Sequence, residues 1–212
     1  MKRAWMVAVA LLAGLRLHAG EAKPAADFRV RVYMDYQGKA ADLAVAHLSM
    51  AIASRMFRSI GVTLMWVNST SCPPEGVRIT VAGHTPATLH PGALAYATPY
   101  EGTHIRVFLD RIEATQPALV PHLLAHVLVH ETIHILEGCT RHSDHGLMKA
   151  HWDDVDRAQM VWADLPIAPE DIHLVHLGIQ LRAQPAAAHT NQNSMAETPA
   201  PTLAAPILAA TR

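Results

Sequence analysis

The chain has 212 residues, of which 50% are hydrophobic and 17% are charged, so it has room for one packed domain with tails. Its formal net charge of -1 argues against nucleic acid as a partner, because binding to phosphates needs a basic face. The 15 histidines are many for this length, although an excess of histidine alone is weak evidence for a metal site.

The first 22 residues have the pattern of a secretory signal peptide. Lys2 and Arg3 precede an uncharged, mostly apolar run at residues 4–15, and the small residues Ala19, Gly20 and Ala22 offer a cleavage region. The run is short for a membrane span, although an uncleaved anchor is the alternative. We therefore expect an exported protein, periplasmic or secreted, with no stable membrane span after cleavage of the signal.

Hydrophobic periodicity predicts an order of strand, helix, further strands and then helices. In chain order, we expect a strand at 28–34, a helix at 39–60, strands at 63–67, 77–82, 93–97 and 105–110, and helices at 118–137, 152–163 and 169–181. The run at 93–97 is short and suits an edge strand. This order favours an α+β fold, with a mixed twisted sheet, a backing helix and a helical second half.

Residues beyond the last predicted helix have a different composition from the domain. The segment 183–212 is rich in Ala, Pro, Thr, Gln and Asn, which predicts a disordered tail after a folded domain at residues 27–182. Export permits a disulfide between the two cysteines, Cys72 and Cys139, but two unpaired thiols fit the sequence equally well.

The apolar helix at 118–137 carries the motif His130-Glu131-Thr132-Ile133-His134. Residues four apart share one face of a helix, so His130 and His134 can bind one ion, while Glu131 can reach a water in the open coordination position. Zinc lowers the pKa of such a water, and the carboxylate accepts its proton as general base. Two histidines and a glutamate on a buried helix need a purpose, and a catalytic zinc site supplies one.

A catalytic zinc ion needs a third protein ligand, which we expect shortly after this helix. The candidates are Glu137, His142, His145 and His151. Glu137 lies at the helix end, where we expect a solvated side chain. His142 and His145 both follow the helix break at Gly138, and sequence spacing alone does not separate them.

The segment from His130 to Met148 resembles the metzincin clan of zinc metalloproteases, and the matrixins in particular. In that clan the zinc-binding helix ends at a glycine, a third histidine follows, and a tight turn carries a methionine below the metal. The pair His142-Ser143 followed by Leu147-Met148 is similar to the matrixin ending. Three residues lie on each side of Gly138 here, where the clan has two, so the segment is two residues longer than usual.

The resemblance implies a metzincin-like fold and a set of site residues. It gives His130, His134 and His142 as zinc ligands, Glu131 as the base and Met148 as the methionine of the Met-turn, with His145 as the alternative third ligand. It also implies that the edge strand near 93–97 pairs with an extended peptide or protein substrate.

We therefore expect an exported zinc-dependent endopeptidase that hydrolyses peptide bonds with a zinc-bound water activated by Glu131. One alternative is a zinc hydrolase of a non-protein amide or ester. Another is a non-catalytic, zinc-stabilised exported binding domain, although a purely structural site has no need of a base such as Glu131. We expect His122 and His126 to be exposed or to touch a metal ligand, and Trp152 and Trp162 to lie in the core.

Overall fold

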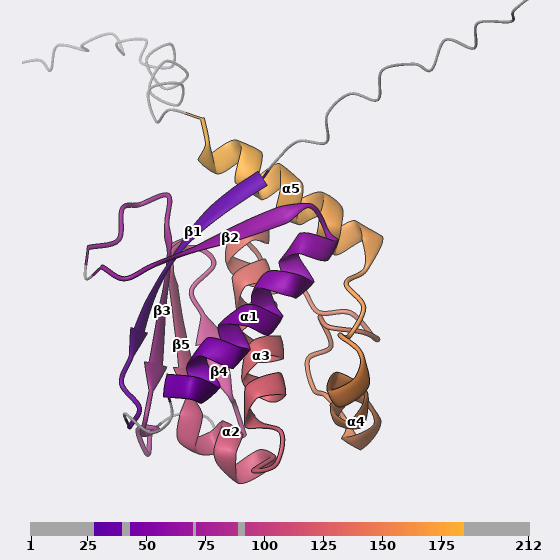
Figure 1. Cartoon of the computed structure of the whole chain (residues 1–212). Helices are drawn as coiled ribbons and strands as arrows, with labels where there is room; N and C mark the ends of the chain where they lie inside the picture. The colour runs from indigo at the N-terminus through magenta and orange to yellow at the C-terminus, as the bar shows by residue number, and fades with distance from the viewer. Residues whose placement is uncertain (1–27, 40–42, 70, 89–91, 185–212) are drawn as a thin grey trace, which may run out of the picture.

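The computed structural model describes residues 28–39, 43–69, 71–88 and 92–184 (Figure 1). The expected signal segment 1–22, and all but the first two residues of the expected tail 183–212, lie outside these ranges. The strands are β1 (Phe28–Tyr36), β2 (Val62–Val67), β3 (Val77–Ala82), β4 (Ala95–Ala97) and β5 (His104–Phe108). The helices are α1 (Leu43–Ser59), α2 (Leu109–Thr115), α3 (Val120–Glu137), α4 (Asp154–Trp162) and α5 (Pro169–Arg182). None of these helices is long and apolar enough to cross a bilayer.

The five strands form one sheet in the order β2-β1-β3-β5-β4. Neighbouring strands are parallel except for β4, which pairs antiparallel with β5 at the edge. Alternation along β3 buries Val77, Ile79 and Val81 on one face, as the period-two pattern predicts. The prediction of a mixed sheet with a short edge strand is confirmed.

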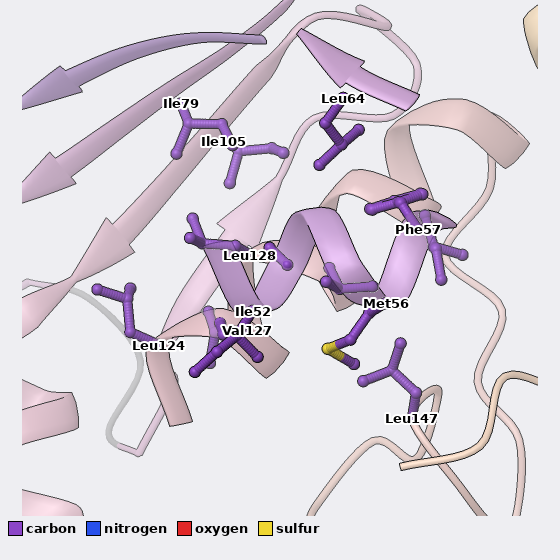
Figure 2. Close-up of a cluster of buried hydrophobic side chains, with 14 of the residues drawn as sticks. Ile52, Met56, Phe57, Leu64, Ile79, Ile105, Leu124, Val127, Leu128 and Leu147 are labelled. Carbon is purple, nitrogen blue, oxygen red and sulfur yellow. The ribbon is translucent and has the colours of Figure 1, made fainter. Parts of the chain in front are cut away.

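The core lies between this sheet face and two helices. Helices α1 and α3 pack side by side against the sheet (Figure 1). Figure 2 shows Ile52, Met56 and Phe57 of α1 facing Leu124, Val127 and Leu128 of α3, with Ile79 and Ile105 supplied by the sheet. Because α3 is also covered by α5, nearly all of its residues are buried. The helix that carries the motif is therefore held by neighbours on several sides.

Helix α5 crosses the C-terminal end of α3 in close contact. Gly178 lies directly against the backbone of Leu136, and Arg182 Nη2 donates a hydrogen bond to Ile135 O at 2.6 Å. His176 Nε2 donates to Ile60 O at 2.7 Å, which ties α5 to the end of α1 as well. These contacts fix the end of α3 immediately after His134.

Two expectations about local structure are wrong. The strand predicted at 105–110 ends at Phe108, because Asp110 accepts hydrogen bonds from the backbone N and the hydroxyl of Thr85 and lies in the first turn of α2. Trp162, expected in the core, is 86% exposed. Of the two positions expected for His126, exposed or touching a metal ligand, the exposed one is excluded, because the side chain is fully buried. The two thiols of Cys72 and Cys139 are free, so the structure contains no disulfide between them.

Candidate metal centre

Helix α3 places His130 and His134 on one buried face, with exposed fractions of 7% and 5%. Pro121 lies in its first turn, where a missing N–H costs nothing, and the helix ends at Gly138. Gly138 has a φ of 69°, a left-handed conformation that glycine adopts without strain. The chain then turns back under the helix, and it brings His142 to the other two histidines.

The Nε2 atoms of the three histidines converge. His134 Nε2 lies 3.0 Å from His130 Nε2 and 3.3 Å from His142 Nε2. The opposite nitrogens of the two helix histidines are both engaged with backbone carbonyls: His130 Nδ1 donates to Leu147 O at 2.9 Å, and His134 Nδ1 donates to Cys139 O at 3.1 Å. A neutral imidazole that donates through Nδ1 carries a lone pair on Nε2. Two lone pairs therefore face each other at His130 and His134.

Burial keeps these rings neutral. It lowers the pKa of His130 to about 4 and that of His134 to about 3, and the neighbouring histidines lower the His134 value further. Burial also lowers the pKa of His142. At neutral pH neither ring carries a proton on Nε2 that could form a hydrogen bond between the facing lone pairs. A metal cation between the two nitrogens would satisfy both lone pairs.

The distances fit a tetrahedral metal. Two histidine nitrogens at about 2.0–2.1 Å from zinc, at a tetrahedral angle, lie about 3.3 Å from each other. The observed separations of 3.0 and 3.3 Å are close to this value. The His130, His134 and His142 cluster is therefore able to bind a metal, and three nitrogens leave one tetrahedral position open.

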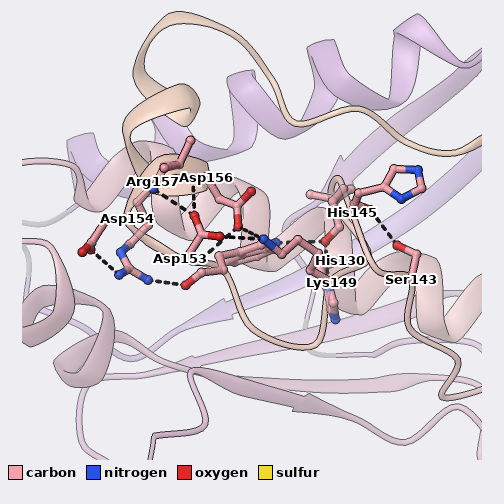
Figure 3. A network of polar contacts seen from close by, with 11 residues as sticks. His130, Ser143, His145, Lys149, Asp153, Asp154, Asp156 and Arg157 are labelled. Carbon is pink, nitrogen blue, oxygen red and sulfur yellow. Dashed lines mark hydrogen bonds and ion pairs between the residues drawn. The ribbon is translucent and has the colours of Figure 1, made fainter.

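The other candidates for a third ligand lie elsewhere. His145 is exposed, and its ring points away from the neighbouring residues in Figure 3. Glu137 turns toward Cys139, with Oε2 3.5 Å from Sγ, and burial together with the charge of Asp171 raises its pKa to about 7. Its carboxyl is thus partly buried rather than solvated, contrary to expectation. His151 lines the nearby cleft outside the cluster.

His126 lies four residues before His130 on the same helix, but its hydrogen bonds leave no ring nitrogen free to bind a metal. Its Nδ1 donates to His122 O at 2.7 Å, and its Nε2 accepts from the backbone N–H of Leu165 at 3.2 Å. Both ring nitrogens are therefore occupied, and His126 joins α3 to the segment after α4.

Glu131 lies beside the cluster and lines the adjacent cleft. Burial raises the pKa of its carboxyl to about 7, with no other contribution. A carboxyl in this position can exchange a proton near neutral pH, as a general base must.

The loop after His142 is held beneath the helix. Ser143 N donates to Met148 O at 2.8 Å, and Leu147 N donates to Pro166 O at 2.9 Å. Gly146 has a φ of 74°, and a Cβ there would collide with Pro166 O, so the turn requires glycine. Leu147 and Met148 are buried in the core. The expected tight turn at residues 146–148 is present, with the methionine side chain inside the protein.

A network of charges closes this side of the site. Lys149 Nζ binds Asp153 Oδ2 at 3.0 Å and also contacts Asp156, while Arg157 pairs with Asp154 (Figure 3). Asp153 also caps α4 by accepting from the N–H groups of Val155 and Asp156. The acidic residues at 153–156 therefore begin helix α4.

A cleft of about 540 Å³ opens over the cluster. The residues that line it include those of β4, residues 149–152, and Leu123 and Val127 of α3. Trp152, expected in the core, is partly buried against it and also lines this cleft. Its Nε1 donates to Leu147 O at 3.1 Å, and its ring lies 5.5 Å from that of His130. Its position four residues after the turn at 146–148 gave no sequence signal for this role.

No protein-family model and no curated protein sequence matches the chain. Among solved structures, the archaemetzincin from Methanopyrus kandleri is 11% identical, with 74% of this chain and 98% of that chain covered and a TM-score of 0.50. The archaemetzincin from Archaeoglobus fulgidus, in complex with malonate, is 12% identical, with 68% and 99% covered and a TM-score of 0.47.

At these identities the likeness is one of fold. The chain has a mixed α/β fold similar to that of archaemetzincins, with a mostly parallel five-stranded sheet. Within that fold the described residues include a three-histidine cluster able to bind a metal. The matrixin-like ending at residues 142–148 stays a resemblance of the sequence.

Proposed function

We propose that the protein is an exported zinc-dependent endopeptidase, with His130, His134 and His142 as ligands and Glu131 as general base. The observation that carries the proposal is the convergence of the Nε2 atoms of three histidines beside the buried carboxyl of Glu131, which lines an open cleft. The archaemetzincin-like fold agrees with the resemblance of the motif to metzincins.

The chemistry divides between the metal and the chain. A zinc ion held by the three histidines supplies a water of lowered pKa and a Lewis acid for the substrate carbonyl. Glu131 accepts a proton in the cleft and returns it to the leaving amine. The positive charge of the ion favours the ionised form of Glu131, which the base needs. The backbone bonds to Leu147 O and Cys139 O hold both helix histidines in the tautomer that presents Nε2.

The edge strand supports a peptide as substrate. Phe108 N donates to Leu94 O and Thr98 N donates to His104 O, so these alternate residues face β5. By the same alternation, the N–H and C=O groups of Ala95 and Ala97 point away from β5, toward the open edge beside the cleft. An extended peptide can add to this edge through backbone hydrogen bonds alone. A non-protein amide or ester has no use for such an edge.

The lining of the cleft supports cleavage within a chain. Among the described residues that line it, Glu131 is the only carboxylate, and it is committed to the base role. Lys149 and Arg157, the lining cations, are paired with aspartates. Neither terminus of a peptide therefore meets a free opposite charge there, so an internal bond is the better substrate.

The test is made on the purified chain. We expect bound zinc, cleavage of an unfolded protein that a chelator abolishes and added zinc restores, and a loss of about 10²- to 10⁴-fold in kcat for Glu131→Ala with zinc retained. Glu113→Ala, a change in the exposed part of α2, is the matched control and should leave cleavage unchanged. Chelator-resistant cleavage, or full activity of Glu131→Ala, contradicts the proposed mechanism.

The export part of the proposal rests on residues 1–22 and has its own test. Expression of the full gene in a bacterium with a periplasm should give a mature chain that begins near residues 20–23, outside the cytoplasm. N-terminal sequencing of the fractionated protein measures this. A cytoplasmic protein that still begins at Met1 contradicts export and leaves the metal chemistry untouched.

A further inference from the structure

An ion pair between the partly exposed Arg141 and the buried Asp171 joins the loop before His142 to helix α5. Arg141 Nη2 donates to Asp171 Oδ1, and Arg141 Nη1 lies 3.5 Å from Glu170 Oε2. Asp171 is in the first turn of α5 and is 1% exposed, whereas the Glu170 side chain is 69% exposed. The pair therefore connects the residue next to a cluster histidine with a helix about thirty positions further along the chain.

Stability alone does not account for this pair. Among the described residues, Arg141 Nε is buried without a hydrogen-bond partner, and the buried Asp171 faces a second carboxyl, that of Glu137. Buried charges with unsatisfied atoms lose solvation that one ion pair does not fully return, and well-packed apolar side chains are often as stable in their place. A role in placing a neighbouring group explains why charge is kept there.

The neighbouring group is His142, which differs from the two helix histidines. His130 and His134 are buried and each is oriented by a backbone carbonyl. His142 is exposed, and its Nδ1 makes no hydrogen bond within the described part of the chain. Its ring is therefore placed by the backbone on either side. Ser143 fixes the downstream side through the bond from its N to Met148 O at 2.8 Å.

We propose that the Arg141–Asp171 ion pair is the positioning device for His142, fixing the upstream side of this third metal ligand against α5. The segment between Gly138 and His142 has three residues, so it needs an anchor that a shorter connection would not. Asp171 also balances the charge of Arg141, which otherwise lies beside a cation site. This inference rests on the proposed metal site, and Arg141 and Asp171 are positioning residues that touch neither the metal nor the substrate.

The experiment measures metal binding to the full chain rather than activity. Metal-free protein is titrated with zinc against a competing chelator, and with Co²⁺ while the visible absorption of the tetrahedral ion is recorded. We expect Asp171→Asn to weaken zinc binding by about 10- to 100-fold and to alter the cobalt spectrum, as loss of an orienting partner of a ligand does. Glu170→Gln, which changes the exposed neighbour, is the matched control and should bind both metals as the wild type does.

A second variant separates positioning from folding. Arg141→Met combined with Asp171→Leu removes both charges of the pair, including the buried carboxylate, so we expect a fold about as stable as the wild type. Zinc binding should still be at least about tenfold weaker than in the wild type, because the Arg141–Asp171 ion pair that positions His142 is gone. No uncompensated charge remains to account for the loss. Normal zinc binding by this folded double variant overturns the inference, whether or not Asp171→Asn folds.

A third comparison asks whether the effect passes through His142. In a His142→Ala background, Asp171→Asn should cause little further loss of zinc affinity, because the ligand that it positions is already absent. An equal loss in both backgrounds overturns the inference. A wild-type chain that binds no zinc contradicts the proposed function itself, so the two failures are distinguishable.

Discussion

The contact between Gly178 and α3 predicts that alanine at this position is destabilising, although alanine is the better helix former. A Cβ on residue 178 would lie 2.8 Å from the carbonyl carbon of Leu136 and still closer to its oxygen. The obstacle is helix backbone, which cannot rotate away as a side chain can. The two helices must therefore separate, and the bond from Arg182 to Ile135 O is disturbed with them.

The magnitude follows from two opposing effects. Overpacking against backbone costs about 3 kcal/mol, the upper part of the usual range. The higher helix propensity of alanine returns about 1 kcal/mol. We expect Gly178→Ala to lower the free energy of unfolding by about 2 kcal/mol, and to lower Tm by roughly 4–8 °C in a domain of this size.

Urea and thermal unfolding of the metal-free protein measure this change. Gln180→Ala is the control, because Gln180 is exposed on the same helix and should shift the free energy of unfolding by no more than about 0.5 kcal/mol. A Gly178→Ala protein that is as stable as the wild type, or more stable, would show that helix propensity outweighs the contact. The reasoning about the packing of α5 on α3 would then be refuted.

Three further predictions concern the histidines. His142→Ala should lose bound zinc on dialysis whereas His145→Ala keeps it, as metal analysis of the two proteins will show; the reverse result moves the third ligand to His145. Burial holds the pKa values of His130 and His134 at about 4 and about 3, so protons compete little with zinc at these two ligands. The zinc Kd should therefore rise less than about fourfold from pH 7.5 to 6, whereas three histidines of ordinary pKa would give a rise of roughly 50-fold. This titration is best made in Glu131→Gln, where the glutamate does not titrate, and a steep rise would contradict the lowered values. Burial also lowers the pKa of His126, so below about pH 6.5 the folded state binds fewer protons than the unfolded chain does. The free energy of unfolding therefore falls as the pH falls below that value. Between pH 7 and pH 5, the free energy of unfolding in urea should therefore fall less for His126→Gln than for the wild type. An equal fall in both proteins would show that His126 does not cause the loss.

The parts of the site that lie close in sequence could be predicted from it. The spacing of His130 and His134 sets their common face by helix geometry alone, and Gly138 ends that helix in the structure as expected. The choice between His142 and His145 depends instead on the path of a loop. That path is set by the backbone bond from Ser143 to Met148 and by a contact with α5, neither of which leaves a periodic pattern.

The parts that the sequence did not reveal depend on distant contacts. Trp152 and Trp162 are the same residue type in one predicted helix region, yet one lines the cleft and the other is exposed. The turn of the chain before α4 decides between these outcomes. Helix α2 was hidden because Leu109 extends the apolar run of β5, and only the bonds from Thr85 to Asp110 show where the strand ends.

The orienting bonds of the two helix histidines have a consequence for how this site tolerates change. Both acceptors, Leu147 O and Cys139 O, are main-chain atoms, so no replacement of the side chain at 139 or 147 deletes them. A substitution at either position can therefore change the tautomer of His130 or His134 only if it moves the loop. An insertion or deletion between Gly138 and Met148 shifts the carbonyls themselves. The site therefore tolerates side-chain replacements at these two positions but not a change in the length of the loop between Gly138 and Met148.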